Sequence, residues 1–354
     1  MRYLAVDTAK KISKIGLGTW QFGSKEWGYG ELYDEGLAQA IVRRALDLGV
    51  TLFDTAEIYS SGRSERILGQ AVGENQESVV LATKVWPIVP TASWVQRRAI
   101  ASAHRLGVPH LDIYQVHWPN PIVGDSAIMR GMRSVQQSGL IHEVGVSNYS
   151  LERWRAAEDL LHSRILSNQV AYSLVERSPE RDLIPFAESH GRVVIAYSPL
   201  AQGMLSGKYH GASRPTNPVR ATSALFHPAN LESTSDLIAV LREVADAHGV
   251  TPAQVALAAV IRRPGVAAIP GASSVEQLES NVAAAEIELT DDEYQALDKA
   301  SARFCPAAVK DGSPRRGLST VRHNLASLKH LSKGGVFVAQ TARRDYHLKH
   351  FPIT

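Results

Sequence analysis

The sequence predicts a (β/α)8 barrel, also called a TIM barrel, with two additional helices and a basic C-terminal extension. From about residue 15, short apolar runs alternate at a steady spacing with amphipathic segments, and eight such runs can be counted. Strict alternation of strands and helices is typical of a parallel sheet, and eight strands favour a closed barrel. The alternative is an open doubly wound sheet, which usually carries G-x-G-x-x-G after its first strand. The string "GLGTWQFG" at that place does not match it.

The eight predicted strands are short runs rich in apolar and β-branched residues, as expected for strands buried on both faces. They are Ile15–Gly18, Thr51–Asp54, Ser78–Thr83, Leu111–Val116, His142–Val146, Ser167–Val170, Arg192–Ala196 and Val266–Ile269. Segments such as "TASWVQRRAIASAHRLG" and "SAIMRGMRSVQQSG" lie between them and predict the surrounding helices. Several end in glycine, the residue that most easily adopts the left-handed conformation of a helix C-cap.

Two further helical segments, Pro252–Arg263 and Asp291–Ser301, do not fit one helix per strand and are predicted to be the additions. A connection rich in Gly, Pro, Ser and Asn follows the seventh strand over residues 199–235, and loops of this length are usually functional or mobile. The alternation ends at Arg303. We therefore expect a barrel over residues 1–302. For the tail over 303–354, three states remain open: partial disorder, packing on the barrel, or binding of a partner.

Composition places the chain among ordinary globular proteins, with 354 residues, 44% hydrophobic and 21% charged. Residues 303–354 carry a net charge of +8 and the remainder −5, so the overall pI is a poor argument for nucleic-acid binding. A single cysteine, Cys305, excludes an internal disulfide and a cysteine-based metal cluster. The longest apolar stretch, "VALAAVI", is far shorter than the roughly 20 residues of a membrane span. With no apolar leader visible, we expect a cytoplasmic protein without nucleic-acid or membrane partners; its oligomeric state is open.

Four residues at or just past the ends of predicted strands point to acid–base chemistry. Asp54 and Tyr59 stand in "TLFDTAEIYSSGRSE", Lys84 in "VVLATKVWP" and His117 in "LDIYQVHWP". Residues in such positions converge on one face of a parallel β/α fold, where these folds carry out their chemistry. A phenol, an ammonium, a carboxylate and an imidazole brought together there are suited to donating a proton.

Taken in order, several separated strings of this sequence resemble the aldo-keto reductase family. They are "GLGTWQFG", "FDTAEIYSSGRSERILG", "ATKVW", "DIYQVHWP", "GVSNYS", "NQVAYSL", "AYSPLAQGMLSGKY" and "IPGASSVEQLESN", and the similarity runs from about residue 10 to 302. The strings "SGKY" and "IPGASS" are closer to the branch of bacterial reductases and potassium-channel β-subunits than to the aldose reductase type. The resemblance implies a (β/α)8 oxidoreductase that uses NADPH, or less favourably NADH, to reduce aldehydes and ketones to alcohols.

Both the resemblance and the chemistry of the residues assign the same catalytic roles. Tyr59 is expected to be the proton donor, although an unperturbed phenol has a pKa of about 10 and is a weak acid. An adjacent Lys84 ammonium stabilises the phenolate and is expected to lower that pKa, while Asp54 orients the lysine. His117 is expected to donate a hydrogen bond to the carbonyl oxygen of the substrate.

The resemblance also implies a set of cofactor contacts. Ser147, Asn148 and Gln169 would hold the nicotinamide carboxamide, and Tyr197 would stack on the ring. The loop after the seventh strand would meet the pyrophosphate with Ser198, Leu200, Gln202 and Gly203, and with Lys208 as counter-charge. The adenosine end would be met by Gly271, Ser273, Gln277 and Asn281, beside a helix N-terminus.

The chain departs from its apparent relatives at the adenosine end. Ser280 stands where the channel-subunit branch has Glu before the asparagine, which puts one adenine contact in doubt. Gly271 and Gln277 stand where the aldose reductase branch has Lys and Arg for the 2′-phosphate. Recognition of NADP would then depend on Ser273 and a loop arginine, for which Arg220 is the first choice and Arg214 the second.

Three tryptophans beside catalytic strand ends, Trp20, Trp86 and Trp118, are expected to form an apolar substrate cleft. Such a cleft suits aromatic or medium-sized aldehydes and ketones, and Trp27 and Tyr29 would contribute to its rim. The thirteen histidines are scattered and show no H-E-x-x-H pattern, so no metal site is expected.

Two other functions use the same fold and cofactor. One is an NADPH-binding redox-sensing or regulatory subunit with little turnover. The other is an NAD(P)-dependent sugar or alcohol dehydrogenase. The complete set of four catalytic residues favours the reductase.

Overall fold

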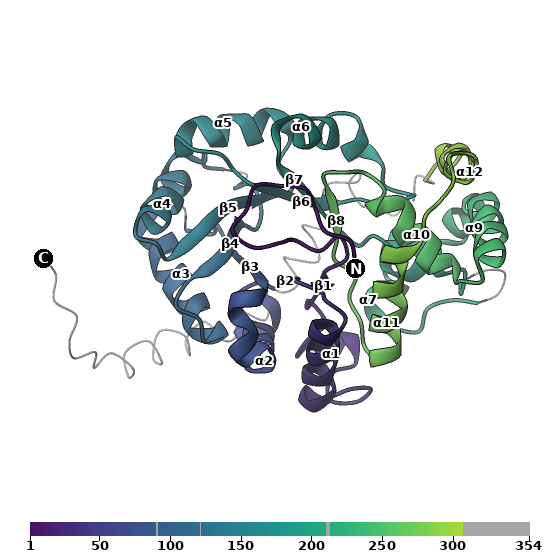
Figure 1. Cartoon of the computed structure of the whole chain (residues 1–354), viewed down its shortest axis with the longest axis horizontal. Coiled ribbons are helices and arrows are strands. Elements are labelled where there is room, and N and C mark those ends of the chain that lie inside the picture. The colour runs from purple at the N-terminus through teal and green to yellow at the C-terminus, as the bar shows by residue number, and fades with distance from the viewer. Residues whose placement is uncertain (90, 121, 210–212, 307–354) are drawn as a thin grey trace, which may run out of the picture. The chain divides into compact units, whose positions relative to one another are not determined.

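Eight parallel strands form the centre of the structure, a computed structural model that describes residues 1–89, 91–120, 122–209 and 213–306. Each strand pairs with the next in sequence order from β1 to β8. A parallel bridge between Ile15, just before β1, and Ala268 of β8 joins the two ends of this order. Figure 1 shows the helices arranged around the strands. The predicted (β/α)8 fold is therefore confirmed.

The strands closely follow the apolar runs of the sequence. They are β1 (Leu17–Gly18), β2 (Leu52–Asp54), β3 (Val80–Val85), β4 (Leu111–Val116), β5 (Ile141–Ser147), β6 (Ser167–Ala171), β7 (Val193–Tyr197) and β8 (Val266–Ala268). β4 coincides with its prediction, whereas β3 begins and ends two residues later than predicted. Lys84 therefore lies within β3 rather than just after it.

The helices of the described part of the chain alternate with the strands as far as β7. They are α1 (Glu35–Asp47), α2 (Arg63–Val72), α3 (Ala92–Leu106), α4 (Ser126–Gln137), α5 (Leu151–Leu161), α6 (Leu183–His190), α7 (Pro218–Ala221), α8 (Pro228–Ser233), α9 (Ser235–His248), α10 (Pro252–Ile261), α11 (Val275–Ala283) and α12 (Asp291–Ala302). Local sequence explains their ends. At α3, the Thr91 side chain accepts a hydrogen bond from the Trp94 N–H, and Gly107 ends the helix with a φ of 70°.

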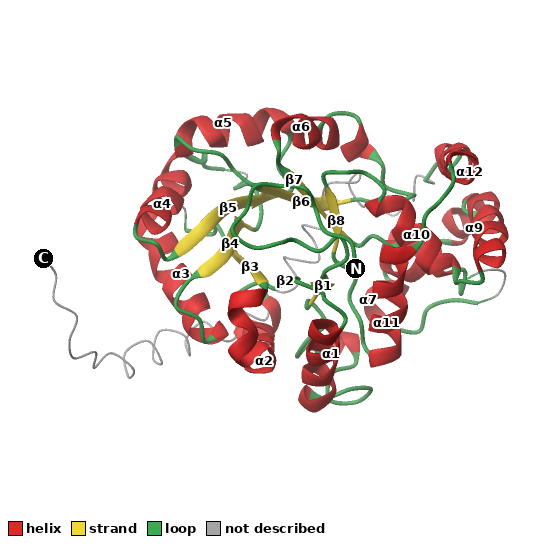
Figure 2. Ribbon diagram, in the orientation of Figure 1, coloured by secondary structure: helices red, strands yellow, loops and turns green. Residues whose placement is uncertain are grey.

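One prediction about the helices is wrong. The segment 252–263 is not an addition: α10 packs against β8 and α11, and its residues 255–261 are all buried. It is the barrel helix between β7 and β8. The additions are α9 and α12, which pack on each other beside α10 (Figure 2) around a separate apolar cluster that includes Leu241 and Leu297. Because α10 is apolar on all sides, its sequence lacks the one-sided pattern of the other barrel helices.

The N-terminal segment covers one end of the barrel. Tyr3 and Ser13 form an antiparallel bridge, and the Leu4 N–H donates to the Ile12 carbonyl at 2.8 Å. Leu4 and Ile12 are buried in a cluster with the inward-facing side chains of the strands. In Figure 1 this segment, in dark purple, crosses in front of the strands. The amino-terminal end of the barrel is thereby closed, which leaves the opposite end for ligands.

α12 ends at Ala302, the last residue of the predicted barrel. The predicted basic tail lies outside the described residues from position 307 onward. In the described part of the chain, no single helix is long and apolar enough to cross a membrane, and the pair α9 and α10 meets that test only together, with a bend of 95° between them.

Candidate active site

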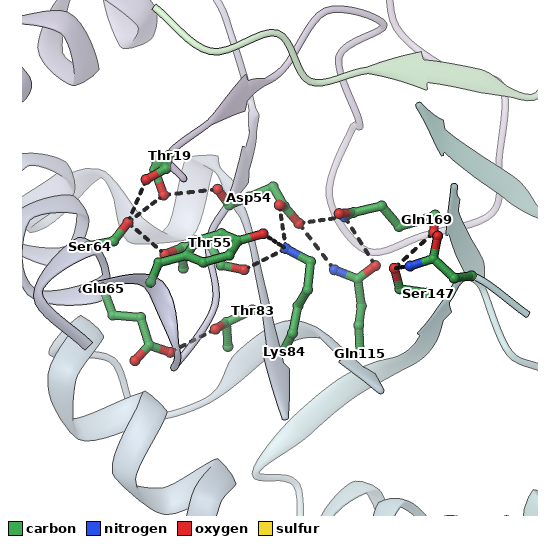
Figure 3. Close-up of polar contacts among 12 residues, drawn as sticks. Thr19, Asp54, Thr55, Ser64, Glu65, Thr83, Lys84, Gln115, Ser147 and Gln169 are labelled. Carbon is green, nitrogen blue, oxygen red and sulfur yellow. Dashed lines mark hydrogen bonds and ion pairs between the residues drawn. The ribbon is translucent and has the colours of Figure 1, made fainter. Parts of the chain in front are cut away.

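The four predicted catalytic residues lie together at the carboxyl-terminal end of the barrel. The Lys84 Nζ donates to Asp54 Oδ1 at 2.5 Å, to the Thr55 carbonyl at 2.8 Å and to the Tyr59 hydroxyl at 3.3 Å. The ring of His117 lies edge-to-face with that of Tyr59, with 5.7 Å between the ring centroids. Figure 3 shows the Lys84 ammonium beside the Asp54 carboxylate. A continuous chain of polar contacts therefore runs from Asp54 through Lys84 to the Tyr59 hydroxyl.

Two buried amides hold the other oxygen of Asp54. Gln169 Nε2 donates to Asp54 Oδ2 at 2.7 Å, and Gln115 Nε2 does so at 3.2 Å. Gln115 lies in β4 and Gln169 in β6, on either side of β5, and both side chains reach toward Asp54 (Figure 3). Because each lone pair of a buried carboxylate needs a partner, these contacts fix the orientation of Asp54 and hence the position of Lys84.

The environment fixes the protonation of the site. Burial raises the pKa of Tyr59 above its usual value, although the Lys84 ammonium acts in the opposite direction. Lys84 thus lowers the pKa of Tyr59 as expected, but loss of solvation outweighs its charge and the net shift of the pKa is upward. Burial lowers the pKa of Lys84, but Asp54 and Tyr59 raise it and prevail. Tyr59 is thus a protonated donor at neutral pH beside a permanent ammonium.

His117 is a neutral imidazole in this site. Burial and the Lys84 ammonium together hold its pKa well below the usual value of 6.5. A lowered pKa means that the neutral form persists to a lower pH than for a free histidine. His117 therefore has one N–H to donate and adds no charge near neutral pH.

We expect the ring of His117 to show no titration midpoint near the ordinary histidine value, because burial and the Lys84 ammonium shift its pKa downward. The measurement is a pH titration of histidine ring signals by NMR, with the His117 signal assigned by its absence in His117→Asn. A midpoint near the ordinary histidine value of about 6.5 would contradict the described environment.

The residues predicted to hold the nicotinamide form one network with the catalytic carboxylate. Ser147 Oγ donates to the Gln169 carbonyl at 2.9 Å, and Asn148 Nδ2 donates to Ser147 Oγ at 2.9 Å. The Tyr197 hydroxyl then donates to Asn148 Oδ1 at 3.0 Å. Asn148 has a φ of 61°, which turns its side chain out of the strand direction. The predicted carboxamide contacts are therefore adjacent to one another, and Gln169 joins them to Asp54.

The loop after β7 has an unusual backbone. Ser198, Ala201, Gln202 and Gly203 all have positive φ between 49° and 97°. Three of these residues, Ala201, Gln202 and Gly203, are consecutive, and the N–H groups of Ala201 and Gly203 donate to the Ser198 and Leu200 carbonyls at 2.8 and 2.9 Å. Gln202 Oε1 is buried without a hydrogen-bond partner among the described residues. Leu200 precedes the short helix at Ala201–Ser206, and Lys208 is exposed just beyond it.

Arg220, on α7, reaches back to this loop. Its Nε donates to the Gln202 carbonyl at 2.8 Å, and its guanidinium lies 5.2 Å from the centre of the Trp27 ring. Asn217 Nδ2 also donates to the Glu26 carbonyl at 2.8 Å. The segment around α7 therefore connects the loop after β7 with the loop after β1.

The residues predicted for the adenosine end gather at the start of α11. Gln277 Oε1 accepts from the Ser273 N–H at 2.9 Å and from its hydroxyl at 3.1 Å. Asn281 Nδ2 donates to the Gly271 carbonyl at 3.3 Å. A Cβ at Gly271 would lie 2.7 Å from Gln21 Oε1, so this glycine allows the loop after β1 to approach. The four residues therefore lie next to one another, and their contact with the adenosine end of a cofactor stays a prediction.

The three tryptophans predicted for the substrate cleft differ in how closely they approach the catalytic residues. Trp86 lies edge-to-face with His117 at 5.5 Å, and Trp20 does so with Trp27 at 5.2 Å. Trp118 follows His117 directly, and its Nε1 is buried without a hydrogen-bond partner in the described part of the chain. Trp86 is therefore the tryptophan in contact with the catalytic group.

Several buried polar residues of the site were not predicted from the sequence. Glu57 accepts from the Trp86 N–H at 2.7 Å and pairs with Arg98. Burial raises the pKa of Glu57, and Arg98 opposes that shift. Gln115 lies in β4, two residues before His117, which directly follows the strand, so the alternation of strand faces would have placed both side chains on the inward face. No comparable signal marked Glu57.

Comparison with known proteins agrees with this geometry. The model of the Aldo/keto reductase family matches residues 14–302. An uncharacterized oxidoreductase of Mycobacterium tuberculosis is 54% identical over 309 residues, 87% of this chain and 95% of that protein. A putative voltage-gated potassium channel subunit beta of Schizosaccharomyces pombe is 30% identical over 82% of this chain and 90% of its own length.

A solved structure shows the same similarity. An aldo-keto reductase from Klebsiella pneumoniae in complex with NADPH has a TM-score of 0.68 and 33% identity, over 88% of this chain and 98% of that one. The relatives include a bacterial oxidoreductase and a channel-subunit protein, the branch that the motifs indicated. The chain that places Asp54, Lys84 and Tyr59 at its barrel mouth belongs to the aldo/keto reductase family of oxidoreductases.

Proposed function

We propose that the protein reduces aldehydes and ketones to alcohols with NADPH, with Tyr59 as proton donor. The observation that carries this proposal is the Tyr59 hydroxyl, which lies 3.3 Å from a buried ammonium and stays protonated at neutral pH. When bound, the reduced nicotinamide supplies a hydride to the carbonyl carbon. Tyr59 gives its proton to the carbonyl oxygen, which completes the alcohol and leaves a phenolate.

The other three residues support that proton transfer. Lys84 stabilises the phenolate as it forms, because its ammonium is desolvated and cannot be screened by water. Asp54 keeps Lys84 charged and in position through the 2.5 Å contact. Neutral His117 donates its N–H to the carbonyl oxygen, which orients the substrate and stabilises developing charge there.

NADPH fits the residues that surround the site. Ser147, Asn148 and Gln169 would hold the carboxamide, and Tyr197 would lie against the ring. The loop after β7 would meet the pyrophosphate, and the buried Gln202 Oε1, without a partner in the described chain, is an acceptor suited to a ligand. Similarity to the Klebsiella NADPH complex supports this cofactor.

The mouth of the barrel is apolar, which supports substrates with an aromatic or aliphatic body. Six exposed large hydrophobic residues lie in the loops after β1, β3 and β4: Trp20, Leu32, Ile88, Val89, Ile122 and Val123. Together with Trp86 and Trp118 they favour aromatic or medium-sized aldehydes and ketones over phosphorylated substrates. The function is tested by NADPH-dependent turnover of 4-nitrobenzaldehyde, methylglyoxal and a simple aldose.

Arg220→Ala is expected to weaken binding of NADPH at least about tenfold while changing NADH binding little, since a 2′-phosphate contact is charge-assisted. Cofactor fluorescence titration with both nucleotides measures the two dissociation constants. Equal weakening of both would mean that Arg220 supports the loop through Gln202 and that the 2′-phosphate is held elsewhere.

Arg214→Ala is the matched control for this experiment, because it removes another arginine of the same connection. We expect it to leave the ratio of NADPH to NADH affinity unchanged. A selective loss of NADPH affinity in Arg214→Ala alone would transfer the 2′-phosphate role to Arg214.

A further inference from the structure

Three potential metal ligands lie on one face of two neighbouring strands, at the end of the barrel opposite the catalytic residues. His110 precedes β4, Asp112 lies at its start, and His142 lies at the start of β5. Residues 110 and 112 share a face because strand side chains alternate. The pairs Leu111 with Ile141 and Ile113 with Glu143 are in register, which sets His142 beside Asp112.

The side chains of these residues approach closely enough to share an ion. One ligand atom from each lies within 4.8 Å of the other two. The two imidazoles are stacked with their centroids 4.0 Å apart, and His142 Nδ1 lies 3.8 Å from Asp112 Oδ1. Ligand atoms around a tetrahedral Zn²⁺ lie about 3.4 Å apart, given bond lengths of about 2.0–2.2 Å. The His142 side chain is 42% exposed, so it can rotate to close that difference.

The carboxylate of Asp112 is already oriented outward. Its Oδ2 accepts from the Leu81 N–H of β3 at 2.9 Å, which fixes the group and leaves Oδ1 facing the histidines. A hydrogen bond of this kind to the second oxygen is the usual support of a carboxylate that binds a metal.

A cation already sits at this carboxylate. Lys10, from the N-terminal segment, places its Nζ 2.7 Å from Asp112 Oδ1 and 2.8 Å from the Gln76 carbonyl. The ammonium shows that Oδ1 attracts positive charge, and it must leave Oδ1 before a metal ion can bind there. Lys10 therefore competes with a metal ion for this oxygen.

We propose that His110, Asp112 and His142 form a binding site for a divalent transition metal ion such as Zn²⁺, with an affinity that Lys10 limits. Two imidazoles and one carboxylate bind Zn²⁺ in preference to Mg²⁺ or Ca²⁺. A water molecule would complete the four-coordinate geometry. The site lies roughly 16 Å from His117, from five residues of strand at about 3.3 Å each, so it is independent of the reductase chemistry. The spacing of residues in the sequence did not predict this metal site, because His142 is brought next to His110 and Asp112 only by the register of β4 and β5.

The test is a Zn²⁺ titration of the tag-free full chain against a competing chromophoric chelator. We expect the double variant His110→Ala/His142→Ala to lose one bound equivalent of Zn²⁺ relative to the wild type. Lys10→Met is expected to bind that equivalent roughly tenfold more tightly, since it removes the competing charge. Comparing variants keeps the measurement specific even if histidines elsewhere in the chain bind Zn²⁺.

His104→Ala removes an exposed histidine of α3 outside the cluster and should retain the full number of equivalents. Circular dichroism and NADPH-dependent turnover should be unchanged in the double variant. If the double variant binds as much Zn²⁺ as the wild type and as tightly, the site does not exist. If Lys10→Met binds Zn²⁺ no more tightly than the wild type, Asp112 is not a ligand and the three-residue site is wrong.

Discussion

Tyr59→Phe is expected to reduce turnover of carbonyl substrates by at least about 100-fold while NADPH affinity stays within about twofold of the wild type. The magnitude is that of a lost general acid, which typically contributes about 10²–10⁴-fold. The substitution removes only the hydroxyl that lies 3.3 Å from Lys84 Nζ, and the cofactor contacts proposed at Ser147, Asn148 and Tyr197 do not depend on it. Steady-state kinetics with 4-nitrobenzaldehyde and cofactor fluorescence measure the two effects separately.

Tyr29→Phe is the matched control, because it removes a phenol from the rim of the mouth rather than from the catalytic contacts. It should keep nearly full turnover. Undiminished activity in Tyr59→Phe would contradict its role as proton donor. A parallel loss of NADPH affinity would show that the hydroxyl is part of the cofactor site.

Lys84→Met should abolish most turnover and also destabilise the fold by about 3–5 kcal/mol. Lys84 is fully buried against a nearly buried carboxylate, so its removal leaves Asp54 charged without a counter-ion. Only the two amides of Gln115 and Gln169 would still contact the carboxylate. Denaturant unfolding measures the lost free energy, and kinetics measure the lost turnover.

The double variant Asp54→Asn/Lys84→Met separates the two effects. Removing both charges eliminates the buried unpaired carboxylate, so most of the stability should return, whereas turnover should not. If turnover returned together with stability, the loss in Lys84→Met would be structural, and the ammonium would have no direct role in proton transfer.

The sequence was sufficient to predict the strands and to select four candidate catalytic residues that the structure brings together. β4 was predicted with its observed ends, because its apolar and β-branched residues are typical of a buried strand. Active sites in this fold lie at the carboxyl ends of the strands, and these ends can be located in the sequence. This allowed the selection of Asp54, Tyr59, Lys84 and His117 as candidates.

Packing in three dimensions was not accessible in the same way. Whether α10 or α9 docks on the barrel depends on which apolar surface β8 and α11 offer, and α10 itself carries no one-sided pattern. The upward pKa shift of Tyr59 arises from burial, which spacing does not reveal, whereas the opposing Lys84 charge was evident from the motifs. Most of the residues with positive φ after β7 are not glycine, so the sequence did not predict a left-handed backbone there.

Transfer of deuterium from NADPH labelled at nicotinamide C4 to 4-nitrobenzaldehyde tests the central claim most directly. Mass spectrometry and NMR of the product would locate the label. Hydride transfer within the site described above predicts 4-nitrobenzyl alcohol with deuterium on the carbinol carbon and a proton from Tyr59 on the oxygen. Tight binding of NADPH without transfer to this aldehyde, to methylglyoxal or to an aldose would contradict the reductase and favour a subunit that binds NADPH without turnover.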